Sequence, residues 1–290
     1  MDASLAKPQV TGFYDKPTGS IQYIVTDSAT RRCAIIDPVL DFDEKSGATS
    51  TGNADALLDF IAENGLELEW ILDTHPHADH FSAADYLKRK TGAPVGIGER
   101  IVDVQALWKA IYNWPDFRAD GSQWDRLFAD GEIFHIGSLP VTVLFSPGHT
   151  LASITYVIGD AAFIHDTMFM PDSGTARADF PGGSAVRLWQ SIQRILALPG
   201  ETRLFVGHDY QPGGREARWE TTVAEQKRSN SHVHVPTTEA EFVALREARD
   251  KTLPMPRLIL HALQVNMNGG RLPEPEANGK RYLKFPLNGL

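Results

Sequence analysis

Short apolar runs bounded by turn residues alternate along the chain with segments whose apolar residues recur at helical spacing. The strands expected in the first quarter are residues 21–25, 34–36 and 70–72. Between the last two, residues 54–64 carry a helical pattern, with Leu57, Leu58 and Ile61 on one face. The order predicted for this part is strand, strand, helix, strand.

The same alternation continues to about residue 210. We expect helices over residues 81–90 and 185–196. The further strands expected are residues 141–145, 154–158, 161–164 and 204–206. From Arg215 onward the pattern becomes more helical, with a helix expected over residues 239–249, and it turns irregular past Pro273. Strands mixed with helices predict an α/β fold.

Length and composition are those of an ordinary globular protein. The chain has 290 residues, of which 42% are apolar and 22% charged. Because no linker, repeat or low-complexity tract interrupts it, we expect one domain over residues 1–290, with a core at about 12–210 and a helical or irregular C-terminal extension at about 211–290.

A formal net charge of -9 argues against a nucleic-acid partner, which would require a basic face. An anionic ligand must therefore be held by a local basic cluster. Neither a signal-peptide core nor an apolar run of membrane-spanning length is present, so we expect a cytoplasmic location and no membrane partner. The single cysteine, Cys33, lies in an apolar run and predicts a buried, inert thiol. The sequence allows a homodimer but does not establish the oligomeric state.

Four metal-capable side chains crowd together directly after the apolar run at residues 70–72. The sequence Thr-His-Pro-His-Ala-Asp-His at residues 74–80 places His75, His77, Asp79 and His80 in one loop. Imidazole and carboxylate groups suit zinc, iron and manganese. The cluster therefore predicts a metal site, in preference to a group of surface histidines.

Three later junctions between strands and loops supply further candidates. They are His149 within Pro-Gly-His-Thr, Asp166 after a strand, and His208 within Gly-His-Asp-Tyr. Loops beyond strand ends commonly form sites in sheets flanked by helices, so one pocket can collect all seven groups. Seven candidates exceed the four ligands of a closed structural zinc site, and no suitable thiolate is available. The pattern favours a catalytic metal over a structural one.

The order of these motifs resembles the metallo-β-lactamase superfamily from about Ile21 to Tyr210. That resemblance implies a four-layer αββα sandwich with the metal at one edge. In the two-metal hydrolases of the superfamily, one ion would be held by His75, His77 and His149, the other by Asp79, His80 and His208, with Asp166 bridging.

A narrower resemblance is to the persulfide dioxygenases, which are related to glyoxalase II. It rests on Arg177-Ala-Asp179-Phe180, with further matches at residues 197–200 and 253–256. The match is partial, because Thr175-Ala176 stands where that family carries Cys-Gly. The resemblance implies a single Fe(II) held by His75, His149 and Asp166, a set of two histidines and one carboxylate. The other four groups, His77, Asp79, His80 and His208, would then orient ligands or hold water.

The substrate implied by this resemblance is glutathione persulfide, which carries two carboxylates and a terminal sulfur anion. The residues expected to bind it are Arg177, Tyr210, Lys227 and Arg228. Two simpler interpretations stay open: Arg177 forms a structural ion pair with Asp179, and Lys227 and Arg228 lie on a solvated helix face.

Five histidines lie outside the motifs and are expected to be hydrogen-bonded or surface residues: His135, His165, His232, His234 and His261. His165 precedes Asp166 in an extended strand, so its side chain should face the opposite way.

Two catalytic hypotheses follow, together with a non-catalytic one. The first is an iron-dependent persulfide dioxygenase that oxidises glutathione persulfide with O₂ to sulfite and glutathione. The alternative is a hydrolase with two Zn(II) or mixed metals, acting on glutathione thioesters as glyoxalase II does, or on another thioester or lactone. The third is a module whose metal only stabilises the fold. A true β-lactamase and an RNA-processing enzyme fit the sequence less well.

Overall fold

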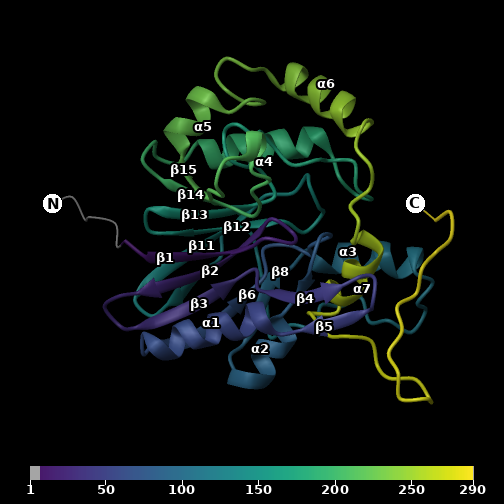
Figure 1. The fold of residues 1–290 in the computed structure, drawn as a ribbon. Helices are drawn as coiled ribbons and strands as arrows, with labels where there is room; N and C mark the ends of the chain where they lie inside the picture. The colour runs from purple at the N-terminus through teal and green to yellow at the C-terminus, as the bar shows by residue number, and fades with distance from the viewer. Residues whose placement is uncertain (1–6, 290) are drawn as a thin grey trace.

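Two β-sheets lie face to face at the centre of the molecule, and helices cover the outer face of each (Figure 1). The computed structural model describes residues 7–289. These layers form the expected αββα sandwich, and the predicted fold class is confirmed.

Within residues 7–289 each large sheet has six strands. The first runs, in spatial order, β1 (Gln9–Asp15), β2 (Ser20–Asp27), β3 (Arg32–Ile36), β6 (Glu67–Leu72), β8 (Val95–Gly98) and β9 (Arg126–Phe128). The second runs β10 (Ile133–Ile136), β11 (Leu139–Phe145), β12 (Ile154–Ile158), β13 (Ala161–His165), β14 (Arg203–Val206) and β15 (Glu220–Thr222). A small third sheet has the order β5 (Ala48–Ser50), β4 (Val39–Asp43) and β7 (Phe81–Ser82).

The helices divide between the two outer layers and the C-terminal segment. Three helices lie between β5 and β9 in the sequence: α1 (Gly52–Glu63), α2 (Ala84–Thr91) and α3 (Ile101–Ile111). Those beyond β13 are α4 (Ala185–Leu196), α5 (Val223–Ser229), α6 (Glu239–Asp250) and α7 (Ile259–Asn266), with a short 3₁₀ turn at Pro212–Gly214. In Figure 1, α4, α5 and α6 lie above the second sheet, while α1 and α2 lie below the first.

Alternation along the strands divides the apolar residues between two cores. In β2, Tyr23 and Val25 face the second sheet, whereas Ile24 faces α1 and α2. The neighbouring strand β3 repeats this division, because Ile36 joins the core between the sheets and Ile35 joins the outer core. Successive side chains of a strand point to opposite faces, so a strand buried on both faces is apolar throughout.

Helix α4 covers the second sheet with residues spaced three or four apart. Leu188, Ile192 and Ile195 are fully buried against the sheet. The helix begins after Ser184, whose hydroxyl accepts a hydrogen bond from the Arg187 N–H, as favoured N-cap residues do.

The hydrophobic pattern located most elements correctly. The expected strands fall within β2, β3, β6, β11, β12, β13 and β14, and three expected helices match α1, α4 and α6. The helix expected over residues 81–90 is wrong at its start, because Phe81 and Ser82 pair with Leu40 and Val39 of β4 and the helix begins at Ala84. That pairing is a long-range contact, which outweighs local helical spacing.

The C-terminal segment is more regular than the sequence indicated. Helix α7 was not predicted, and β15 adds a strand to the second sheet beyond the expected core boundary at about residue 210. Among residues 7–289, no helix has the length and apolarity needed to cross a bilayer.

Asp27 joins the edges of the two large sheets. Its Oδ2 accepts hydrogen bonds from the Ser138 N–H at 2.7 Å, the Ser138 hydroxyl at 2.8 Å and the Thr30 hydroxyl at 2.7 Å. Burial raises the pKa of this carboxyl, but these bonds and one from the Ala29 N–H outweigh burial and lower the pKa to about 2.

We expect Asp27→Asn to destabilise the fold by about 1–3 kcal/mol at neutral pH, because donors that faced a carboxylate oxygen would meet an amide NH₂. A lowered folded pKa gives stability that is present above the unfolded value of 3.8 and lost as pH falls through about 2. Denaturant unfolding of both proteins should therefore show a difference that shrinks as pH falls from about 4 toward about 2. A difference independent of pH would contradict this account of Asp27.

Candidate metal centre

Four strand ends meet at one edge of the sandwich and carry the predicted ligands. The loop at residues 74–80 follows β6, His149 lies in the loop after β11, Asp166 follows β13, and His208 lies just past the end of β14. Because β13 and β14 are parallel neighbours, their carboxyl ends bring Asp166 and His208 together.

Glycine precedes two of the ligands because the space there is filled. A Cβ on Gly148 would lie 2.3 Å from the backbone nitrogen of Leu188, at the start of α4. A Cβ on Gly207 would lie 2.6 Å from Oδ1 of Asp166. Any other residue at these positions would push His149 or His208 away from the site.

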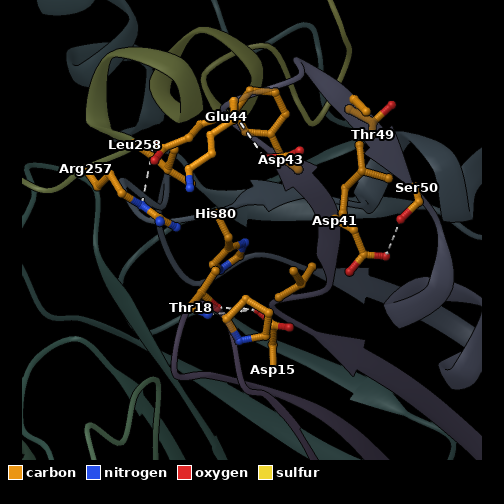
Figure 2. Close-up of a pocket in the computed structure, with 16 residues that line it drawn as sticks. Asp15, Thr18, Asp41, Asp43, Glu44, Thr49, Ser50, His80, Arg257 and Leu258 are labelled. Atoms are coloured by element: carbon orange, nitrogen blue, oxygen red, sulfur yellow. Dashed lines mark hydrogen bonds and ion pairs between the residues drawn. The ribbon is translucent and has the colours of Figure 1, made fainter.

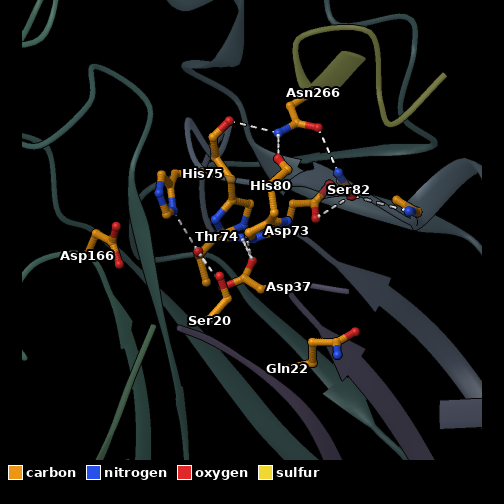
Figure 3. A network of polar contacts seen from close by, with 12 residues as sticks. Ser20, Gln22, Asp37, Asp73, Thr74, His75, His80, Ser82, Asp166 and Asn266 are labelled. Carbon is orange, nitrogen blue, oxygen red and sulfur yellow. Dashed lines mark hydrogen bonds and ion pairs between the residues drawn. The ribbon is translucent and has the colours of Figure 1, made fainter. Parts of the chain in front are cut away.

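His75, His149 and Asp166 form a compact group of buried side chains. One ligand atom from each lies within 4.8 Å of the others, and His149 Nε2 is 3.6 Å from Asp166 Oδ2. In Figure 3 the His75 ring lies between the polar network and Asp166. These are the three residues that the persulfide dioxygenase resemblance predicted as iron ligands.

Each histidine of this group has one ring nitrogen occupied and one available. His149 Nδ1 lies 2.8 Å from the Arg177 carbonyl, which can only accept, so Nδ1 carries the proton and Nε2 keeps its lone pair. His75 Nδ1 contacts the Thr74 hydroxyl at 3.0 Å, while its buried Nε2 has no hydrogen-bond partner among residues 7–289. An orphaned buried nitrogen beside a second imidazole and a carboxylate fits a metal ion.

Burial also keeps the two histidines in the neutral form that binds metals. Burial lowers the pKa of His75 well below its usual value, and the nearby His77 lowers it further. Burial lowers the pKa of His149 despite the opposing effect of Asp166. Neither ring has to lose a proton at neutral pH before it coordinates a metal.

His208 bridges two carboxylates. Its Nδ1 lies 2.6 Å from Asp166 Oδ1 and its Nε2 lies 2.7 Å from Asp79 Oδ2, which also accepts from the Ser20 hydroxyl at 2.9 Å. Burial lowers the pKa of His208, but the two carboxylates outweigh burial and raise it well above its usual value. Burial raises the pKa of Asp166, and His208 outweighs that effect and lowers it. In this arrangement His208 orients Asp166 as a hydrogen-bond donor.

His77 lies beside both His75 and His80, with its ring centre 4.2 Å from each of theirs, and pairs with a carboxylate. Its Nε2 is 3.0 Å from Asp37 Oδ1, and both side chains are buried with Asp73 close by. Burial lowers the pKa of His77, but Asp37 outweighs burial and raises it to about 9. The contact with Asp37 is at ion-pair distance, and neither ring nitrogen of His77 has a hydrogen-bond partner among residues 7–289.

His80 groups with His77 and Asp79 and faces an adjoining, acidic cavity. Its Nδ1 contacts the Phe81 carbonyl at 3.0 Å, and the ring lines a cavity of about 480 Å³ (Figure 2). The acidic lining comes from Asp15, Asp41, Asp43 and Glu44. This cavity shares Thr18 and Arg257 with the larger cavity beside the metal group.

The larger cavity, of about 630 Å³, opens onto His149 and Asp166. Of the four predicted substrate-binding residues, Arg177 and Tyr210 line it. Lys227 and Arg228 do not belong to its lining and lie exposed on α5. Three further arginines that the sequence did not indicate also line the cavity: Arg246, Arg249 and Arg257.

Arg177 forms the ion pair that was considered as its simpler role. Its Nε and Nη2 donate to the two carboxylate oxygens of Asp179 at 2.6 and 2.8 Å, and its Nη1 donates to the Pro254 carbonyl at 2.6 Å. The guanidinium also lies over the Phe180 ring, 5.1 Å from its centre. These contacts fix the guanidinium in the cavity wall. Arg177 therefore forms the ion pair with Asp179 and also lies beside the group of three.

Asn266 on α7 is a residue of the site region that the sequence did not reveal. Its amide Nδ2 donates to the carbonyls of His77 and His80, each at 2.7 Å, and its Oδ1 accepts from the Ser82 N–H at 2.7 Å (Figure 3). The available signal was the pair of amide side chains, Gln264 and Asn266, in the largely apolar stretch at residues 258–267. Asn266 is buried and braces the loop that carries the first cluster.

The five remaining histidines lie outside the metal-capable groups found among residues 7–289. His165 is buried, with its Nε2 near the hydroxyls of Ser146 and Thr167 at 3.0 and 2.9 Å. His232 is buried and accepts from the Thr175 N–H, whereas His135 and His234 are exposed and His261 is half-buried.

Comparison with known proteins identifies the superfamily. The sequence profile of the metallo-beta-lactamase superfamily matches residues 18–208, and the chain belongs to that superfamily. A "beta-lactamase hydrolase-like protein" of Xylella fastidiosa is 70% identical over 99% of this chain, which spans 66% of that relative's length.

Two other relatives bear on the chemistry. "Glyoxylase B2" of Dictyostelium discoideum is 48% identical over 98% of both chains. The human mitochondrial "persulfide dioxygenase ETHE1" is 29% identical over 86% of this chain and 83% of its own length. The crystal structure of ETHE1 from Myxococcus xanthus superposes with a TM-score of 0.73 at 31% identity, covering 91% of this chain and all of that one.

If His75, His149 and Asp166 bind one ion, His75→Ala and Asp166→Ala should each abolish tight Fe(II) binding, because each removes one of three ligands. His80→Ala should leave the bound metal largely intact, since His80 faces the other cavity. Metal content after anaerobic loading and desalting measures this. Equal loss of metal in all three variants would contradict the assignment of one metal ion to His75, His149 and Asp166.

Proposed function

We propose that this chain is an iron-dependent persulfide dioxygenase that converts glutathione persulfide, O₂ and water to glutathione and sulfite. The observation that carries the proposal is the division of the seven superfamily residues. Ligand atoms of His75, His149 and Asp166 lie within 4.8 Å of one another, and both ring nitrogens of His208 contact carboxylates. His77 lies beside Asp37 and groups with Asp79 and His80. Two histidines and one carboxylate are the ligand set of non-haem Fe(II) oxygenases.

The chain's own residues would position the reactants. An Fe(II) ion at this site would supply coordination positions for O₂ and for the persulfide sulfur, together with the electrons that activate O₂. His208 holds the Asp166 carboxylate in place, and the Arg177 carbonyl fixes the orientation of His149. Phe169 and Phe180 line the cavity beside these ligands and limit the access of water.

The lining of the larger cavity supports an anionic, peptide-like substrate. Arg177, Arg246, Arg249 and Arg257 provide cationic groups in a protein whose overall charge is negative. Leu253 and Met255 add apolar surface next to them. A volume of about 630 Å³ lies within the range of sites for ligands of this size.

A second candidate is a two-metal hydrolase of glutathione thioesters. It is favoured by the presence of all seven superfamily residues and by the 48% identity to a protein named glyoxylase B2. It requires His208 to leave at least one of the two carboxylates that it now contacts. A cytoplasmic location and a homodimer remain predictions.

Oxygen consumption distinguishes the two candidates. Protein loaded anaerobically with one equivalent of Fe(II) should consume O₂ and release sulfite in equal amounts when glutathione persulfide is added, because the reaction uses one O₂ per sulfite. An O₂ electrode and sulfite quantification measure this. Fully loaded protein that consumes no O₂, yet hydrolyses a glutathione thioester with two metal ions bound, would replace the first candidate by the second.

Arg177→Ala should raise the KM for glutathione persulfide by about tenfold or more, since a charged hydrogen-bond partner contributes about 1.5–3 kcal/mol. Iron content should change little, because His149 contacts the backbone carbonyl of Arg177. Lys227→Ala is the matched control and should leave KM unaltered, as Lys227 lies outside the cavity lining. Steady-state kinetics with metal analysis decides; equal KM values for both variants would remove Arg177 from the substrate site.

A further inference from the structure

We infer that Thr74 and Asp37 are positioning residues that place the proton of His75 on Nδ1 and so leave Nε2 free to bind the metal ion. Neither residue is among the seven candidate metal-binding groups, and their contacts determine the state of the ring. The inference concerns the ligand-binding form of His75 and uses no assumption about the substrate.

The fold brings the three residues together at the ends of adjacent strands. Strands β3 and β6 are parallel neighbours with Ile36 opposite Leu72. Asp37 is therefore beside the loop that begins at Asp73, and its N–H donates to the Leu72 carbonyl at 2.8 Å. Asp37 holds this place with a φ of +52°, a left-handed conformation that aspartate tolerates better than most residues but at a cost.

The direction of the hydrogen-bond chain follows from a count of protons. The Asp37 carboxylate accepts twice from Thr74, from its N–H at Oδ1 and from its hydroxyl at Oδ2, both at 2.7 Å. A hydroxyl has one proton, so the bond to Asp37 uses it. The 3.0 Å contact between Thr74 Oγ1 and His75 Nδ1 can then be a hydrogen bond only if Nδ1 donates.

This direction determines the chemistry of His75. A neutral imidazole carries one proton, so a proton on Nδ1 leaves a lone pair on Nε2. Nε2 is a buried atom without a hydrogen-bond partner among residues 7–289, in a side chain whose ligand atom lies within 4.8 Å of those of His149 and Asp166. In the alternative tautomer, Nε2 would carry the proton and its N–H would point at the metal position. The Thr74 hydroxyl would then have no hydrogen bond to accept from His75. Figure 3 shows Thr74 beside both His75 and Asp37.

Substitutions at Thr74 test the inference against a matched control. Thr74→Val keeps the shape and removes the hydroxyl, and Thr74→Ser restores the hydroxyl. Thr221 is the control, because it is also buried and its hydroxyl donates to a carboxylate, that of Glu225, at 2.7 Å. Thr221→Val therefore removes a comparable bond away from the metal centre.

Two measurements are made on the full chain. Nitrogen-15 NMR of the metal-free wild type should show His75 protonated at Nδ1, as should Thr74→Ser. Anaerobic competition with a chromophoric chelator should show Fe(II) binding about 10- to 100-fold weaker in Thr74→Val, with Thr74→Ser and Thr221→Val within about threefold of wild type. Wild-type His75 protonated at Nε2, or equal Fe(II) affinities of Thr74→Val and Thr221→Val, would overturn the inference.

Asp37→Asn provides a second variant with an opposite signature. The amide oxygen must face the Thr74 N–H and His77 Nε2, which both lie beside Oδ1 of Asp37, so the amide NH₂ faces the Thr74 hydroxyl. The hydroxyl would then accept from Asn and donate to His75 Nδ1, which moves the ring proton to Nε2. NMR should detect this reversal, and a ring that stays protonated at Nδ1 would count against the inference. Because no substrate is used, a chain that binds Fe(II) in this way but consumes no O₂ would refute the proposed function alone.

Discussion

Every polar atom buried at the metal centre needs a partner, and this requirement accounts for the arrangement of the residues around it. A buried donor or acceptor left unsatisfied costs about 1–3 kcal/mol. The Thr74 hydroxyl, the Arg177 carbonyl and the His208 ring each satisfy one atom of a candidate ligand. The second atom of each ligand is left over, and coordination to one metal ion would satisfy all three at once. The hydrogen bonds around the site thus select which atoms are available to a metal.

The same requirement separates the superfamily's seven residues into two sets. His208 is held between Asp79 and Asp166, and His77 lies beside Asp37; all of these side chains are buried except Asp79, which is about 25% exposed. Removing one partner of a buried ion pair costs about 3–5 kcal/mol, because the remaining charge is uncompensated. Coordination of a His208 nitrogen to a second metal ion would have to offset that loss of free energy. For this reason we favour one metal ion over two, although the motif itself is compatible with both.

Sequence patterns indicated the candidate ligands that the fold brings together, but not the residues that contact and orient them. The alternating strands and the motif spacing were sufficient, because each ligand follows directly after an apolar run that forms a central strand. Asn266 contacts the loop at residues 77–82 from nearly 190 positions away, and nothing in its local sequence indicates that contact. Asp37 likewise depends on the pairing of β3 with β6. The strand at Phe81–Ser82 was missed for the same reason, since it exists only through its pairing with β4.

The C-terminal segment contributes to the site through charge as well as packing. The superfamily match ends at residue 208, whereas Arg246, Arg249 and Arg257 of the larger cavity all lie beyond it. Arg246 is buried, pairs with Asp250 and donates to the Thr175 carbonyl, while Asp250 accepts from the Ala178 N–H. Helix α6 therefore holds the loop that carries Arg177. Since a net charge of -9 repels anions at long range, an anionic substrate must be attracted by this local set of arginines. In this arrangement the superfamily core provides the candidate metal ligands, and the segment after it provides three of the four arginines in the wall of the larger cavity, two of them paired with carboxylates.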